Sequence, residues 1–258
     1  MSQGLEAVVF EQPLNERIRT FLRLEFLFSQ HAHHRQDSSI FGCRAQLHAM
    51  LDVLMVLGRS DLKKDILREL AEQQNVLTRL LNRPGVDNAR LQAVLGEIGA
   101  AMNGLHQLST TFASSATRDH EFLMSVLNRS SIPGGTCAFD LPAFHHWLSQ
   151  PAEIVQRDLD AWFGEIAPYA HGILLYLRLL RGSVPLIDAL APGGTYVHAP
   201  QGACHLIRVF VPQQDGVYPE ISAGSHRFTL RFMQLRDVNQ RSTQAHRDIA
   251  FKLQCCTF

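Results

Sequence analysis

Two arginines lie four residues apart in the segment HRFTLRFMQL, residues 226–235. Apolar and polar residues alternate along it, which predicts a half-buried β-strand. Its even-numbered apolar residues, Phe228 among them, would face a core, and Arg227 and Arg231 would share the opposite face, about 13 Å apart at roughly 3.3 Å per residue. A guanidinium fork matches a carboxylate, so this face could bind an acidic peptide. The same alternation also fits an ordinary solvated sheet face.

Histidines and cysteines are the other residues that could do chemistry. The run HAHH covers residues 31–34, and His145 and His146 form a second pair. A closed zinc site usually takes four ligands in two closely spaced pairs, and no partner pair follows HAHH, so we expect isolated surface histidines and no metal. Five cysteines form no CxxC motif and are expected to be reduced thiols: Cys43, Cys137, Cys204, Cys255 and Cys256.

Motif and charge patterns disfavour several classes of function. The chain has no GxxxxGK[ST], no strand-borne GxGxxG and no GxSxG, so we predict no cofactor, no catalytic residue and no enzyme. A hydrolase or metal-binding protein that uses the His and Cys residues stays the alternative. Lys+Arg and Asp+Glu both number 24, which gives no global basic field for nucleic acid. The aromatic residues of 226–235 would face away from its arginines, which disfavours RNA binding, although an RNA-binding module remains a hypothesis.

Hydrophobic periodicity predicts helices followed by strands, which is an α+β fold. We expect an N-terminal, mostly α-helical domain at 11–184 packed with a C-terminal antiparallel β-sheet domain made of 1–10 and 185–258, with the short N-terminal strand joining the sheet. The predicted helices are 14–30, 41–57, 61–81, 88–105, 117–126, 142–148 and 152–181. The predicted strands are 7–10, 195–198, 204–211, 217–222, 227–235 and 248–253.

Helix-capping residues, turn residues and a proline indicate where these elements begin, end or break. Asn15, Ser60 and Asp87 are predicted helix N-caps. The residues 213–216, QQDG, and 223–225, AGS, are predicted hairpin turns. Residues 152–181 are expected to form one long helix or a broken pair of helices, with Pro168 as the expected break. The most apolar helix is expected at 173–180, which is interrupted by Arg178 and too short to span a bilayer, so no membrane span and no leader segment are predicted.

Several ordered phrases resemble the ZapD family of FtsZ-associated bacterial division proteins. The resemblance covers nearly the whole chain, and its first and last blocks are the most specific. One departure is Phe21, where the family usually has tryptophan. The matching phrases are FEQPLNERIRTFLRLEFL at 10–27, PGVD at 84–87, SIPGG at 131–135, FDLP at 139–142, HHWL at 145–148, YPEIS at 218–222, RFTLRFM at 227–233 and the cysteine pair at 255–256.

This resemblance implies a non-enzymatic division factor of the cytoplasm that acts at the mid-cell division ring. Such proteins form homodimers, bind the C-terminal tail of FtsZ and crosslink its filaments into bundles that support the Z-ring. The family's arginine pair on the RF..RFM strand, here Arg227 and Arg231, belongs to its tail-binding surface. Arg19, Arg23 and Arg118 are further candidates because they lie in helices that could border the sheet. Neither nucleic acid nor membrane is an expected partner.

Overall fold

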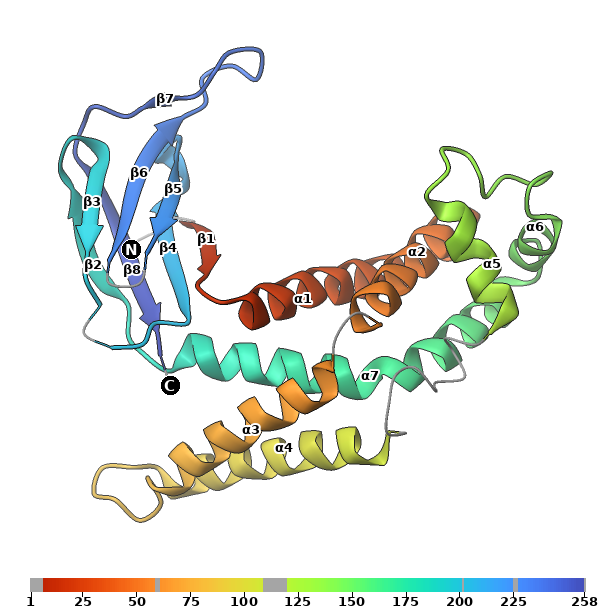
Figure 1. Ribbon diagram of the computed structural model, residues 1–258, viewed down its shortest axis with the longest axis horizontal. Coiled ribbons are helices and arrows are strands. Elements are labelled where there is room, and N and C mark those ends of the chain that lie inside the picture. The colour runs from red at the N-terminus through yellow and green to blue at the C-terminus, as the bar shows by residue number, and fades with distance from the viewer. Residues whose placement is uncertain (1–6, 59–60, 109–119, 201, 225–226, 258) are drawn as a thin grey trace, which may run out of the picture. The chain divides into compact units, whose positions relative to one another are not determined.

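A computed structural model describes residues 7–58, 61–108, 120–200, 202–224 and 227–257 (Figure 1). The fold is α+β, and its strands pair antiparallel, as predicted. The chain forms two compact units. The sheet unit comprises Met1–Arg19 and Arg178–Phe258, and the helical unit comprises Thr20–Leu177.

The helical unit holds most of α1 (Glu16–His34) and of α7 (Ala152–Gly182) and all of the helices between them. Two of the predicted caps are present, at the starts of α1 and α4. The Asn15 side chain accepts a hydrogen bond from the Ile18 amide at 2.9 Å, and Asp87 accepts one from Arg90 at 3.1 Å. Ser60 lies outside the described residues. The intervening helices are α2 (Ile40–Leu57), α3 (Leu62–Thr78), α4 (Asn88–Gln107), α5 (Glu121–Ser130) and α6 (Pro142–Leu148).

Pro168 does not break α7, so that prediction is wrong. Proline removes one backbone donor and crowds the carbonyl four residues earlier, which here belongs to Gly164. Packing on both sides compensates for the lost hydrogen bond, since Leu159 and Ile173 are fully buried. Tertiary contacts therefore override the local propensity of proline.

The most apolar helix is α2 rather than the predicted 173–180 segment. Its 18 residues have the length and apolar composition of a membrane-spanning helix, but 56% of them are buried within the structure. Ser39 caps its first turn, with its hydroxyl accepting a hydrogen bond from the Gly42 amide at 3.0 Å. A buried core helix passes the same test of length and composition, and the burial of α2 favours that interpretation.

The sheet unit contains two sheets rather than the single sheet expected from the sequence. Sheet A has the order β1-β4-β8-β2, and sheet B has the order β3-β6-β5 with β7 also paired to β6. The N-terminal strand β1 joins sheet A, as predicted. Neither β2 nor β7 was predicted. The strands are β1 (Ala7–Pro13), β2 (Ile187–Ala191), β3 (Thr195–His198), β4 (Leu206–Pro212), β5 (Val217–Ala223), β6 (Phe228–Gln234), β7 (Thr243–Gln244) and β8 (Ile249–Cys256).

The two predicted hairpin turns have different outcomes. The Gln213–Asp215 turn, followed by Gly216 at φ 59°, connects β4 of sheet A to β5 of sheet B, so it is a turn between sheets and not a hairpin. The β5–β6 connection is a hairpin, as predicted, and the Gly224 amide donates to the Arg227 carbonyl at 2.9 Å. Ser225 lies outside the described residues.

Aromatic side chains join the inner faces of the two sheets. Phe251 of sheet A contacts Phe232 and Tyr196 of sheet B, with ring centroids 5.1 Å and 5.2 Å apart. In Figure 1, β3, β6 and β5 lie in front of the strands of sheet A. This sandwich fixes one face of each sheet and leaves the other available. Its buried core also includes Ile207, Val209, Val211, Phe228, Leu230, Ile249 and Leu253.

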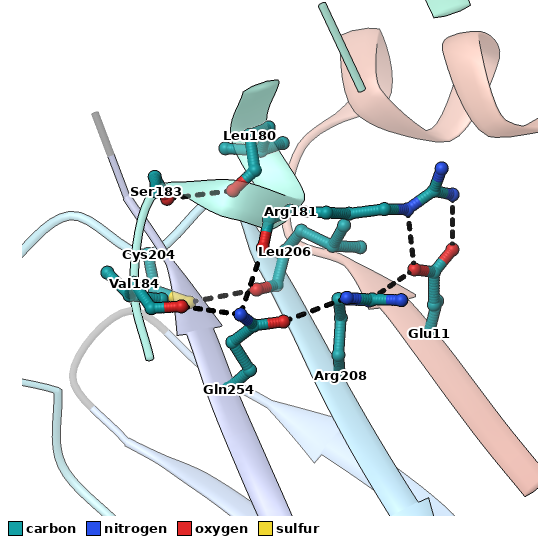
Figure 2. A network of polar contacts seen from close by, with 9 residues as sticks. All are labelled: Glu11, Leu180, Arg181, Ser183, Val184, Cys204, Leu206, Arg208 and Gln254. Atoms are coloured by element: carbon teal, nitrogen blue, oxygen red, sulfur yellow. Dashed lines mark hydrogen bonds and ion pairs between the residues drawn. The ribbon is translucent and has the colours of Figure 1, made fainter. Parts of the chain in front are cut away.

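The outer face of sheet A carries a polar network centred on Glu11 of β1 (Figure 2). The Arg181 guanidinium donates to both Glu11 oxygens, at 2.8 Å and 2.7 Å, and Arg208 donates to Oε1 at 2.7 Å. Gln254 of β8 accepts from Arg208 at 2.9 Å and donates to the backbone carbonyls of Arg181 and Val184. The network therefore ties the end of α7 to three strands of sheet A.

Candidate functional site

β6 is the strand that positions the candidate arginines. It pairs with β5 along its whole length and with β3 over its first four residues, and Phe228, Leu230 and Phe232 are at most 2% exposed. Arg231 is exposed on the opposite side, so the predicted alternation is confirmed. Arg227, also exposed, lies one residue before β6, and His226 is outside the described residues. The buried aromatic row anchors the backbone that carries Arg231.

Register places defined neighbours beside Arg231. Thr195 of β3 lies opposite it on one side and Glu220 of β5 on the other. Directly paired residues share a face, so these three belong to the outer surface of sheet B. We call this surface the arginine face and include Arg227 in it. Its other members are Thr229 and Met233 of β6, Val197 of β3, and Tyr218 and Ser222 of β5.

The arginine face combines polar and apolar groups. Val197 is 57% exposed, and Tyr218 and Met233 are half-buried. The Tyr218 hydroxyl donates to Ser242 at 2.7 Å, which fixes the orientation of the ring. Sequence inspection did not single out these apolar contacts, because Val197 and Tyr218 come from other strands and reach this face only through the register of the sheet.

Charges on the arginine face are open to a ligand. Among the described residues, Arg227 and Arg231 take part in no ion pair within 4 Å. Arg181 and Arg208, by contrast, are both paired with Glu11. Glu220 is the acidic neighbour of Arg231, and this exposed carboxylate reduces the local positive potential without forming a close pair. The face is therefore moderately basic.

The helical candidates stand in different environments. Arg19 lies in the first turn of α1, is half exposed and forms an ion pair with Glu16. Arg23 lies one turn further along α1 and is exposed, so it belongs to the same helix flank as Arg19. Arg118 is outside the described residues. The grouping of these helical arginines with Arg227 and Arg231 stays a prediction.

The structure places one histidine of the HAHH run in the core. His31 is buried, stacks on Phe163 with centroids 3.9 Å apart and lies 3.3 Å from the Gln46 amide, so its prediction as a surface histidine is wrong. The reason is that α1 continues to His34, which turns His31 toward the core. Burial is the main cause that lowers the pKa of His31 to about 4, while Asp160 opposes this effect. His31 is therefore neutral at pH 7.

The described residues contain no group of three or more His, Cys, Asp or Glu side chains arranged to hold a metal ion. The alternative of a metal-binding protein or hydrolase gains no support from the geometry of these residues. The arginine face, in contrast, presents exposed guanidinium groups beside partly exposed apolar side chains. Exposed guanidinium forks beside apolar groups can accept carboxylates and aliphatic side chains from an extended segment.

Comparison with known proteins agrees with the ordered sequence phrases. Residues 22–231 match the family ZapD, described as "Cell division protein". Proteins named "Cell division protein ZapD" are similar along nearly their full length: that of Methylococcus capsulatus is 38% identical over 253 residues, covering 96% of this chain and 98% of its own. That of Azoarcus sp. is 37% identical over 251 residues, covering 97% and 99%. That of Coxiella burnetii is 36% identical over 254 residues, covering 96% and 97%. The chain therefore belongs to the ZapD family of cell division proteins.

Proposed function

We propose that this protein binds the C-terminal tail of FtsZ on the arginine face and crosslinks FtsZ filaments, so that it promotes Z-ring assembly at mid-cell. Membership of a cell division family supports the cellular role. The observation that carries the binding site is the exposure of Arg227 and Arg231 at and beside a strand whose other face is completely buried. A rigid strand holds its charged groups in place before the ligand arrives, which reduces the entropic cost of binding.

The arginine face suits an extended acidic tail with apolar residues. At a strand rise of roughly 3.3 Å per residue, positions 227 and 231 are about 13 Å apart, which an extended ligand would also span with four residues. Carboxylates of the tail would meet the two guanidinium groups. Val197 and Tyr218 offer apolar contact between and beside these charges. The carboxylate of Glu220 sets the register, because it disfavours a second acidic group next to Arg231.

Crosslinking requires two tail-binding sites in one particle. A homodimer with twofold symmetry would supply two identical sites, and simultaneous engagement of two filaments would add avidity. This role needs no nucleotide, metal or catalytic residue and defines a non-enzymatic factor of the cytoplasm. Filament tails at high local concentration would make even a weak single-site affinity effective.

Peptide binding tests the site. A fluorescently labelled FtsZ tail peptide is titrated with the wild type and with the double variant Arg227→Glu/Arg231→Glu, and fluorescence anisotropy gives the Kd. Losing two charge-assisted contacts and adding repulsion should raise the Kd at least roughly 100-fold, since each such contact contributes about 1.5 kcal/mol or more. The wild-type affinity should also fall as the salt concentration rises.

Lys252→Glu is the matched control. Lys252 is an exposed cation on β8 of sheet A, paired with Asp188 at 3.6 Å, and its reversal changes the net charge by half as much as the double variant. It should leave the Kd within about twofold, because exposed charges distant from a site act weakly. Equal binding by the double variant and the wild type would remove the arginine face as the docking site.

Assembly tests the crosslinking step separately. Light scattering of FtsZ polymers should rise on addition of the wild type, and sedimentation equilibrium should give twice the chain mass of 29.0 kDa. The double variant should sediment like the wild type but fail to increase scattering. A monomer that still binds the peptide would retain the tail-binding proposal and overturn the crosslinking one.

A further inference from the structure

Two cysteine thiols meet at the end of sheet A. Cys255 lies on β8 opposite Ile207 of β4, and Cys204 lies two residues before β4 begins. The His205 amide donates to the Cys256 carbonyl at 2.8 Å, which holds the segment before β4 against the end of β8. As a result, the side chains of Cys204 and Cys255, separated by fifty residues of intervening chain, interact as hydrogen-bonded thiols.

The remaining cysteines are differently placed. Cys256 follows Cys255 on β8, so its side chain points to the opposite face, where it is completely buried. Cys43 is buried in α2, and the Cys137 thiol donates to Asp140 at 3.4 Å. Cys204 and Cys255 are both half-buried, which leaves them reachable by a small reagent. The surroundings therefore single out one pair among five cysteines.

The two thiols of this pair are not equivalent. The side-chain interaction with Cys204 lowers the pKa of Cys255, although burial opposes the effect. The pKa of Cys204 is raised, first by this same interaction and then by burial. Burial also raises the pKa of Cys256 to about 11. Cys255 is thus the thiol that ionises first, and a thiolate is the form that attacks a disulfide.

We propose that Cys204 and Cys255 form a redox modification site, which a low-molecular-weight disulfide converts to an intramolecular disulfide. The Cys255 thiolate attacks one sulfur of glutathione disulfide, and one glutathione thiolate leaves. Cys204 then loses its proton to solvent and attacks the Cys255 sulfur of this mixed disulfide, which releases the second glutathione thiolate. Two protein thiols are oxidised by two electrons in total, and one glutathione disulfide is reduced to two glutathione molecules.

The bond would join covalently two parts of sheet A that now have only noncovalent contacts, among them backbone hydrogen bonds and the Arg208–Gln254 hydrogen bond. β8 lies between β4 and β2, and its end also carries Gln254, which bonds to the Arg181 and Val184 carbonyls (Figure 2). Cys204 is drawn in the same view, beside the Leu206 carbonyl that accepts from its thiol at 3.5 Å. A crosslink at this position restrains fraying of the last strand, because it prevents β8 from separating from the segment before β4.

The test uses the full-length chain in buffers with graded ratios of oxidised to reduced glutathione. Free thiols are then blocked, and peptides are mapped by mass spectrometry without reduction. We expect a crosslink between the tryptic peptide 182–208, which holds Cys204, and the peptide beginning at Leu253, with fragmentation assigning the bond to Cys255. A crosslink through Cys256, or unmodified Cys204 and Cys255 in the most oxidising buffer, would overturn the proposal.

Single variants test the order of the two steps. Cys204→Ser should stop the reaction at a stable glutathione adduct on Cys255. Cys255→Ser should leave Cys204 at least 10-fold slower to react, and Cys256→Ser, the adjacent control, should form the crosslink as the wild type does. Glutathione reacting first with Cys204 would contradict the assignment of the attacking thiol. If a variant folds poorly, the mass-spectrometric mapping of disulfides in the wild-type protein still tests the proposal.

Discussion

Replacement of Glu11 by glutamine tests whether the network of Figure 2 stabilises the sheet unit. The carboxylate accepts three hydrogen bonds from Arg181 and Arg208, and the three side chains are each only about a fifth exposed, at 20%, 21% and 18%. Glutamine keeps the shape but offers one acceptor oxygen and no charge. The hydrogen bond that Oε2 accepts from Arg181 is lost at about 1.5 kcal/mol, and the two bonds to the remaining oxygen lose their charge assistance at about 0.75 kcal/mol each, which gives about 3 kcal/mol. This agrees with the low end for breaking a buried ion pair.

Hydrogen exchange is the suitable assay, because both tryptophans lie in the helical unit and their fluorescence does not report on sheet A. A loss of about 3 kcal/mol should accelerate exchange of the most protected amides of β4 and β8 by roughly 100-fold. Asp188→Asn is the control within the same sheet: Asp188 is 88% exposed and pairs with Lys252, and its loss should change exchange by at most about twofold.

Lowering the pH provides a second test of the Glu11 network. Burial raises the pKa of Glu11, but the hydrogen bonds and charges of Arg181 and Arg208 outweigh this effect and hold the pKa below its ordinary value of 4.5. The stabilisation is therefore complete above the unfolded-state pKa and is lost as the pH falls through the folded-state pKa. Wild type and Glu11→Gln should converge in acid. Exchange rates of Glu11→Gln that match those of Asp188→Asn at pH 7 would refute the reasoning.

Two further changes have outcomes set by the structure. Gly194 has φ 76°, and an added Cβ would lie 2.0 Å from the Ala245 carbonyl oxygen, so Gly194→Ala should destabilise the sheet unit by roughly 3 kcal/mol. Gly193→Ala is the control: it has open space around it and should cost only about 1 kcal/mol. Hydrogen exchange measures both losses of stability. His31, whose pKa is lowered to about 4, stays neutral in the folded chain while the unfolded chain binds a proton below about 6.5, so stability should fall by roughly 1 kcal/mol per pH unit between pH 6.5 and 4. Urea unfolding followed by tryptophan fluorescence measures this slope, and its persistence in His31→Gln would rule out His31 as the source.

Sequence reasoning succeeded where a structural feature depends on residues close together in the chain. The alternation in β6 predicted both its buried row and the exposure of Arg231, because a strand reverses its side chains at every residue. Asn15 and Asp87 were recognised as caps, since a capping side chain reaches only the next turn. The ordered phrases likewise indicated the family that the comparisons confirm.

Features that depend on distant residues were decided by tertiary structure. The turn at Gln213–Asp215 is recognisable locally, but only pairing energies assign β4 to one sheet and β5 to another. His31 was expected at the surface, and it is buried because α1 continues past it and Phe163 supplies a stacking partner. Pro168 remains helical because buried neighbours in α7 outweigh its propensity.

The sequence by itself determined the α+β class, the outward-facing Arg231 of β6 and the family. Tertiary structure alone decided what surrounds each charge: Glu11 forms ion pairs with Arg181 and Arg208, while Arg231 lies between Thr195 and Glu220. The physical reason is the sequence separation over which the relevant interactions act. Helix and strand periods act over a few residues, whereas the environment of a charged group is set by strand register and packing between segments far apart in the chain.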